Sequence, residues 1–324
     1  MMSIVRTTSL ILAVLALAYG VAAASGRNCS PPVARSEQQT FPKTPWGDPD
    51  LQGVWSGAAS LLVPVDRDPA LGNRSVLTEE EFRARLARQF KAASPDNIEA
   101  TNFGVEPDLA PATSRQGSLV VDPPNGRRPP RTPEAESRRP PRHSFVPGLF
   151  DSVADLGIFD RCIAFGAISA ALPVNDLEIV QAPGSVAIRA EVIHETRVIP
   201  LDGRPHPSER ITSDSGDSRG RWEGSTLIVE TTNLSGRTNL TGNAGDRLTV
   251  RAKVVERYTL TDRDHLSYEA TIDDPGTWTG PWTIAFPRTR DERFPLFEYA
   301  CHEGNYSLPN ILRGSRSGET RTSN

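Results

Sequence analysis

The stretch 247–260, RLTVRAKVVERYTL, and the stretch 265–273, HLSYEATID, carry the clearest strand pattern in the chain. In the first stretch, charged side chains alternate with a second set that includes Ala252, Val254 and Tyr258. Because neighbouring side chains of a strand point to opposite faces, this alternation predicts a strand with one face toward water. The polar residues TDRD separate the two stretches and favour a turn between antiparallel strands.

Further strand candidates flank this pair on both sides. They are rich in β-branched residues, mostly alternate, and are bounded by Gly, Pro, Asp and Asn turns: 177–182, 185–199, 225–233 and 282–288. Consecutive antiparallel strands close most economically into a barrel, because closure removes exposed edges. We therefore expect a mainly β fold, an antiparallel β-barrel or strongly bent sheet that occupies 151–324.

The first residues, MMSIVRTTSLILAVLALAYGVAAAS, have the features of a secretory signal peptide. A basic residue, Arg6, precedes an apolar run over 10–21 that is short for a membrane span, and small residues follow it. We expect cleavage after a signal peptide at 1–24, a secreted or periplasmic protein, and no integral membrane segment in the mature chain.

The region 25–150 is expected to be an extended wrap that contains one short helix near 79–93. Thr78 and Glu81 have the spacing of a capping box at the start of that helix. Beyond it, the chain is rich in Pro and Arg, with DPPNGRRPPRTPEAESRRPPR as the extreme case, which favours an extended linker. Between residues 94 and 142, only 117–121, GSLVV, resembles a strand.

Composition narrows the choice of partners. The 324 residues carry a formal net charge of −4, and this mild acidity gives no reason to expect a nucleic-acid partner. Proline is frequent, with 28 residues, and hydrophobic residues make up only 37% of the chain, so part of it is expected to lie outside a packed core.

The pentapeptide GDSRG at 216–220 matches the G-x-S-x-G spacing of a hydrolase nucleophile elbow. An elbow needs a strand before its serine and a helix after it, whereas here a polar loop precedes Ser218 and a strand pattern follows. We interpret the pentapeptide as a loop that leads into a β-hairpin. Its charged residues Asp217 and Arg219, with Glu223, are expected near the rim of the barrel.

Two segments concentrate polar residues suited to acid–base chemistry: IHETRVIPLDGRPH from 193, and ACHEGNY from 300. A histidine titrates near neutral pH and can act as an acid or base when a carboxylate orients it. The candidate catalytic residues are His302, His194, Glu195, Asp217, Arg219, Glu269 and Glu303. A zinc site on His194, His206 and His302 lacks any H-x-H or H-E-x-x-H spacing, so no metal and no cofactor is predicted.

Trp278 and Trp282, in DDPGTWTGPWT, are expected either to pack in the core or to form an aromatic wall that contacts a ligand. The candidate ligand-binding residues are Trp278, Trp282, Tyr306, Arg197 and Asn305.

Several motifs resemble those of a large family of secreted bacterial proteins of uncharacterised function. They cover most of the mature chain: TPWGDPDLQGVW at 44–55, SLVVDPPNGR at 118–127, DRCI at 160–163, IHETRVIPLDGRPHP at 193–207, GDSRGRWEGSTLIVETTN at 216–233, YEATIDDPGTWTGPWT at 268–283 and EYACHEGNYSLPNILRG at 298–314. The resemblance implies a barrel similar to the lipocalins.

Three function classes stay open on the sequence. The first is a barrel that binds a small, partly apolar molecule in a cavity. The second is a cofactor-independent hydrolase, isomerase or lyase that uses the same cavity, and the third is an envelope structural or interaction protein. An apolar cavity would favour the first, and convergence of His194, Arg219, Glu269 and His302 would favour the second.

The chain has three cysteines, and export would favour pairing two of them. We expect a disulfide between Cys162 and Cys301, because both lie in strongly patterned segments. A bridge over so long a loop stabilises the fold by about 4–5 kcal/mol in the loop-entropy model.

This pairing predicts one free thiol, at Cys29. Maleimide labelling of the mature protein under denaturing, non-reducing conditions, followed by peptide mass spectrometry, should modify Cys29 alone. Label on Cys162 or Cys301 would rule the pairing out.

Overall fold

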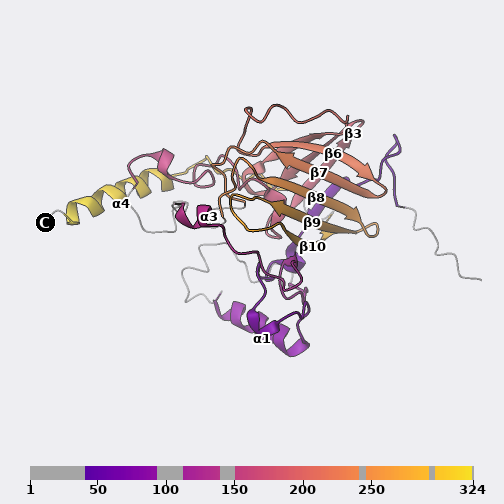
Figure 1. Cartoon of the computed structure of the whole chain (residues 1–324), viewed down its shortest axis with the longest axis horizontal. Coiled ribbons are helices and arrows are strands. Elements are labelled where there is room, and N and C mark those ends of the chain that lie inside the picture. The colour runs from indigo at the N-terminus through magenta and orange to yellow at the C-terminus, as the bar shows by residue number, and fades with distance from the viewer. Residues whose placement is uncertain (1–40, 93–111, 139–149, 241–245, 292–295, 323–324) are drawn as a thin grey trace, which may run out of the picture. The chain divides into compact units, whose positions relative to one another are not determined.

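A computed structural model describes residues 41–92, 112–138, 150–240, 246–291 and 296–322 (Figure 1). The predicted signal peptide at 1–24 and Cys29 lie outside the described residues. In the part of the chain that is described, no helix is both long enough and apolar enough to cross a membrane.

Ten strands form one antiparallel sheet. The strands are β1 (Gly53–Ser56), β2 (Val120–Asp122), β3 (Leu177–Ala182), β4 (Ser185–Ala190), β5 (Thr196–Pro200), β6 (Asp217–Glu223), β7 (Thr226–Thr232), β8 (Lys253–Leu260), β9 (His265–Asp273) and β10 (Trp282–Arg290). Their order is β5-β4-β3-β1-β10-β9-β8-β7-β6, and β2 pairs with β10 off this path. The strands β6 to β10 lie side by side in Figure 1.

The alternation of side chains in 247–260 and 265–273 sets the register of β8 on β9. Their hairpin pairs Leu260 with Leu266 and Tyr258 with Tyr268, and all four side chains face the interior. The two tyrosine rings lie 5.1 Å apart in an edge-on arrangement. A slip of one residue would turn this apolar face to water, so the pattern specifies the register.

The two end strands, β5 and β6, close the sheet into a barrel by packing and not by hydrogen bonds. Gly220 of β6 lies so close to Ile199 and Leu201 that an added Cβ would stand 2.8 Å and 2.6 Å from their side-chain carbons. The barrel is therefore nearly closed, as the sequence predicts.

A buried ion pair joins β5 to β8 across the interior. Arg197 donates from both terminal nitrogens to the Glu256 carboxylate, at 2.6 Å and 3.0 Å, and the two side chains are 7% and 0% exposed. Burial and the nearby carboxylate raise the pKa of Tyr258 and Tyr268 well above 10, so both phenols stay protonated. Both donate to the same oxygen of Glu256, at 2.7 Å and 3.0 Å.

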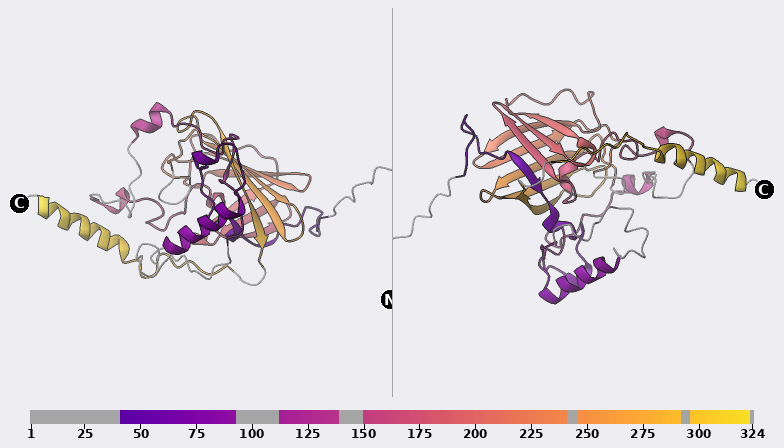
Figure 2. Two further views of the ribbon diagram at one scale, coloured as in Figure 1. Left: turned by 90° about the horizontal axis from the view of Figure 1, so that it is seen from below. Right: turned by 180° about the vertical axis from the view of Figure 1, so that it is seen from behind.

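Two strands come from the region before residue 150. Figure 2 shows β1 beside the sheet strands, and it pairs with β3 on one side and β10 on the other. Its Trp55 is fully buried, and Arg290 stacks on the indole ring at 4.4 Å. The extended N-terminal region thus supplies part of the barrel wall.

The described residues contain three α-helices where the sequence predicts one. The predicted helix is α1 (Glu79–Ala92), and its capping box is confirmed: Glu81 N donates to Thr78 Oγ1, and Thr78 N donates to Glu81 Oε2. The other two are α3 (Pro133–Ser137) and α4 (Ser307–Thr322). Short 3-10 turns, η1 to η5, complete the described elements.

One local prediction is wrong. The GDSRG segment is not a loop: Asp217–Glu223 forms β6, and Ser218 is buried with its hydroxyl bonded to Thr231 Oγ1 at 2.8 Å. The partner strand β7 supplies hydrogen bonds that the polar sequence of β6 does not reveal. The described part of the Pro/Arg-rich region, 112–138, packs on the fold, since Leu119 and Ala135 are buried.

The disulfide Cys162–Cys301 is present, with a Cα–Cα distance of 5.7 Å. It ties the segment that precedes α4 to the loop before β3. This pairing is confirmed.

Substitution of Arg197 by Met should lower the free energy of unfolding by about 3–5 kcal/mol, because it leaves the buried Glu256 carboxylate without its counter-charge. Urea unfolding followed by circular dichroism measures this loss. The double variant Arg197→Met/Glu256→Leu should recover most of it.

The matched control is Arg189→Met, which removes an arginine from a partly exposed pair with Glu178. It should cost at most about 1 kcal/mol. Equal losses for Arg197→Met and Arg189→Met would contradict a dominant role for the buried pair.

Candidate functional site

An apolar cavity of about 240 Å³ lies at the end of the barrel opposite the β6–β7 and β8–β9 hairpins. Strand β10, the approach to β2, the turn η4 (Ser169–Ala171) and the residues Leu240 and Asp246 border it. Its lining is Val65, Leu119, Arg128, Ala171, Leu172, Leu240, Asp246, Trp278, Trp282 and Ile284.

The two predicted tryptophans form one wall of this cavity. Their rings lie 5.1 Å apart at 76°, and each side chain is 2% exposed. Trp282 is the first residue of β10, and its Nε1 has no hydrogen-bond acceptor among the described residues. A buried indole N–H without a partner is costly.

A turn that is fixed by hydrogen bonds to Asp274 holds Trp278 in place. The Asp274 carboxylate accepts hydrogen bonds from Thr249 N, Gly276 N and Thr277 Oγ1, at 2.8, 3.1 and 2.6 Å. The backbone N–H of Trp278 donates to the Asp274 carbonyl at 2.9 Å. Hydrogen bonds of this turn therefore fix the position of the Trp278 backbone.

Ion pairs surround Arg128 at the polar side of the cavity. Its guanidinium pairs with Asp66 at 2.7 Å and with Asp246 at 3.3 Å, and it lies 6.0 Å from the centre of the Trp282 ring. Arg131 also pairs with Asp246, at 3.3 Å. Burial by itself would raise the pKa of Asp66, but hydrogen bonds and charge from Arg128 lower it below its ordinary value of 3.8.

The remaining candidate ligand-binding residues lie elsewhere. The Arg197 guanidinium binds the Glu256 carboxylate through two hydrogen bonds in the barrel core. Asn305 donates to the Cys162 sulfur at 3.3 Å, and the Tyr306 side chain is 75% exposed.

The candidate catalytic residues are not gathered in one place. His194 is exposed, with its Nδ1 3.1 Å from the Tyr299 carbonyl. Glu195 accepts hydrogen bonds from the hydroxyls of Ser169 and Ser215. The side chains of Glu269, His302 and Glu303 are exposed.

Asp217 and Arg219 belong to a separate network on the outer side of β6 and β7. Arg219 binds the Asp217 carboxylate through two nitrogens, at 2.7 Å and 2.8 Å, and His206 Nδ1 lies 2.6 Å from the same carboxylate. The other nitrogen of His206 is 3.6 Å from Glu230, which also pairs with Lys253 at 2.6 Å. No group of three or more His, Cys, Asp or Glu side chains in the described ranges is placed to hold a metal ion.

Local sequence pattern does not mark Asp66, Arg128 and Asp246 as site residues. They lie far apart in the chain, and Arg128 comes from a segment interpreted as a linker. The only available signal was the SLVVDPPNGR motif, which ends directly before Arg128.

No protein-family model matches the chain, and no curated protein matches it either. We therefore base the functional proposal on the geometry of the barrel and of its cavity.

The lowered pKa of Asp66 predicts how stability depends on pH. Because the folded pKa lies below 3.8, the ionised carboxylate stabilises the fold above the unfolded value, and this contribution is lost as the pH falls through the folded pKa. Wild type should thus exceed Asp66→Asn in free energy of unfolding above about pH 5 and lose that advantage in acid.

Urea unfolding across a pH series checks this difference. Asp273→Asn is the control, because Asp273 is exposed and has no ion pair among the described residues. A difference between wild type and Asp66→Asn that stayed constant down to pH 2 would refute the assignment.

Proposed function

We propose that this chain is a secreted or periplasmic binding protein that holds a small, largely apolar molecule in the Trp278–Trp282 cavity. The observation that supports it is the partly open apolar cavity itself, which sits at the mouth of a nearly closed barrel. Ligand cavities of barrel proteins are found at this position, and a lipocalin-like use of the barrel follows from it. The disulfide is consistent with an oxidising compartment.

The cavity volume limits the size of the ligand. An apolar cavity of about 150 Å³ is enough to bind benzene. The 240 Å³ here suits one ring with a short substituent.

The lining also suggests the polarity of the ligand. Apolar side chains dominate, so most of the ligand should be apolar. We therefore propose a substituted aromatic or alicyclic molecule.

The other two function classes have less support. The described residues that line the cavity include no histidine, and its carboxylate, Asp246, is paired with Arg128 and Arg131. An interaction role for the Pro/Arg-rich segment would need free arginines, whereas Arg128 and Arg131 are engaged within the molecule.

Filling the cavity tests the proposal. Ala171 lines it and is 1% exposed, so Ala171→Leu should fit into existing space and change the free energy of unfolding by less than about 1 kcal/mol. Ala167, in the same segment, is 0% exposed and does not line the cavity. Ala167→Leu should cost about 1–3 kcal/mol through overpacking.

Ligand binding is then measured on the same variants. Titration with 4-fluoroacetophenone, followed by ¹⁹F NMR and tryptophan emission, should show binding to wild type and loss of binding in Ala171→Leu. 4-Fluoroethylbenzene, which has a similar shape and no polar group, should also bind to wild type and lose binding in Ala171→Leu. Unchanged binding in Ala171→Leu would refute this site.

A further inference from the structure

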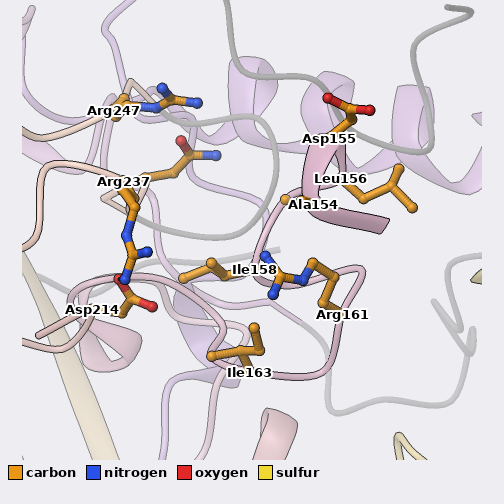
Figure 3. A pocket seen from close by; sticks show the side chains of 11 residues that line it. Ala154, Asp155, Leu156, Ile158, Arg161, Ile163, Asp214, Arg237 and Arg247 are labelled. Atoms are coloured by element: carbon orange, nitrogen blue, oxygen red, sulfur yellow. The ribbon is translucent and has the colours of Figure 1, made fainter. Parts of the chain in front are cut away.

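A second pocket, of about 280 Å³, lies outside the tryptophan cavity (Figure 3). Four separate parts of the chain line it: the loop 154–163, Asp214, the segment around Arg237, and Arg247. Three arginines, Arg161, Arg237 and Arg247, are among the lining residues.

The two acidic residues of this pocket are already engaged. Asp214 pairs with Arg237 at 3.2 Å and accepts the Ser235 hydroxyl at 2.6 Å. The Asp155 carboxylate accepts the backbone N–H groups of Asp151 and Ser152, each at 3.0 Å, and so caps the turn that carries it. Counted formally, the three arginines and two aspartates of the lining leave one positive charge in excess.

Arg161 and Arg247 have no ion pair or side-chain hydrogen bond with any described residue. In Figure 3, Arg161 extends from its loop toward Ile158, Arg237 lies with Asp214 on the other side, and Arg247 stands at the edge of the group. Two guanidinium groups without partners beside one pocket leave it with an excess of positive charge. Guanidinium groups bind carboxylate and phosphate through paired N–H donors.

The pocket also has an apolar side, formed by Leu156, Ile158 and Ile163. Arg161 is held in this arrangement by its neighbour Cys162, which is bonded to Cys301. A ligand that used the whole pocket would combine an anionic head with a short apolar body.

The pocket is separate from the tryptophan cavity, although the two share a wall. Asn239 pairs with Arg247 in an antiparallel bridge, and both line the arginine pocket. Their neighbours Leu240 and Asp246 line the tryptophan cavity. Adjacent side chains of these paired residues thus line the arginine pocket and the tryptophan cavity in turn.

We propose that the arginine pocket is a second binding site, for a small organic anion: a carboxylate or phosphate group on a short apolar chain. Arg161 and Arg247 bind the anionic group, and the apolar side packs against the chain. This site does not depend on the proposed function of the tryptophan cavity.

The test uses the mature, disulfide-bonded protein and isothermal titration calorimetry with hexanoate, acetate, hexyl phosphate and inorganic phosphate. Either Arg161→Gln or Arg247→Gln should weaken binding of hexanoate roughly tenfold or more, since each removes charge-assisted hydrogen bonds. Hexanoate should bind more tightly than acetate because of the apolar side. Comparison of hexanoate with hexyl phosphate identifies the preferred head group.

The control is Arg263→Gln. Arg263 is exposed in the β8–β9 hairpin, lacks an ion pair among the described residues, and changes the net charge equally when replaced. It should leave the Kd for hexanoate unchanged, and so should the cavity-filling Ala171→Leu. Equal weakening by Arg263→Gln, or no binding of any of the four anions, would overturn the proposal.

Both arginine variants should fold, because the side chains they replace bond to no described residue. Circular dichroism and the mass of the intact disulfide check this. A folded Arg161→Gln/Arg247→Gln double variant that bound hexanoate as wild type does would also overturn the site.

Discussion

The buried pair of Arg197 and Glu256 is the constraint on which the barrel depends. The sheet does not close through hydrogen bonds between β5 and β6, and packing of Gly220 against Ile199 and Leu201 brings its two ends together. The bidentate pair joins β5 to β8 through the interior, and two protonated tyrosines complete the hydrogen bonds of the carboxylate. Such a pair is tolerated in a core only when its bonds are this fully satisfied.

A second buried arginine holds the covering segments against the barrel. Arg288 of β10 donates to the carbonyls of Ala170, Leu172 and Asn175, and its guanidinium lies over the Phe286 ring at 5.0 Å. The segment around η4 is thereby fixed across the barrel end, and its side chains bound the tryptophan cavity. The cavity thus results from a polar anchor that holds a non-strand segment over the end of a sheet.

Some parts of this arrangement follow from local pattern and others do not. The β9 strand and the capped start of α1 were predictable because alternation and capping depend on neighbouring residues. Strand β6 was missed because its polar side chains pack on the exposed side of the sheet, where the partner strand supplies its hydrogen bonds. The role of Arg128 was missed because Asp66 and Asp246 meet it only in the folded chain.

The sequence by itself determined the mainly antiparallel β class, the first helix, the disulfide pairing and the inward position of the tryptophans. Each of these depends on side-chain periodicity or on a few residue types with strong preferences. Only the tertiary structure decided that Arg197 is a core residue, that Asp217 binds both Arg219 and His206, and that Arg161 lines one pocket with Arg237 and Arg247. These outcomes depend on which segments meet in space, and long-range pairing leaves no mark in local sequence pattern.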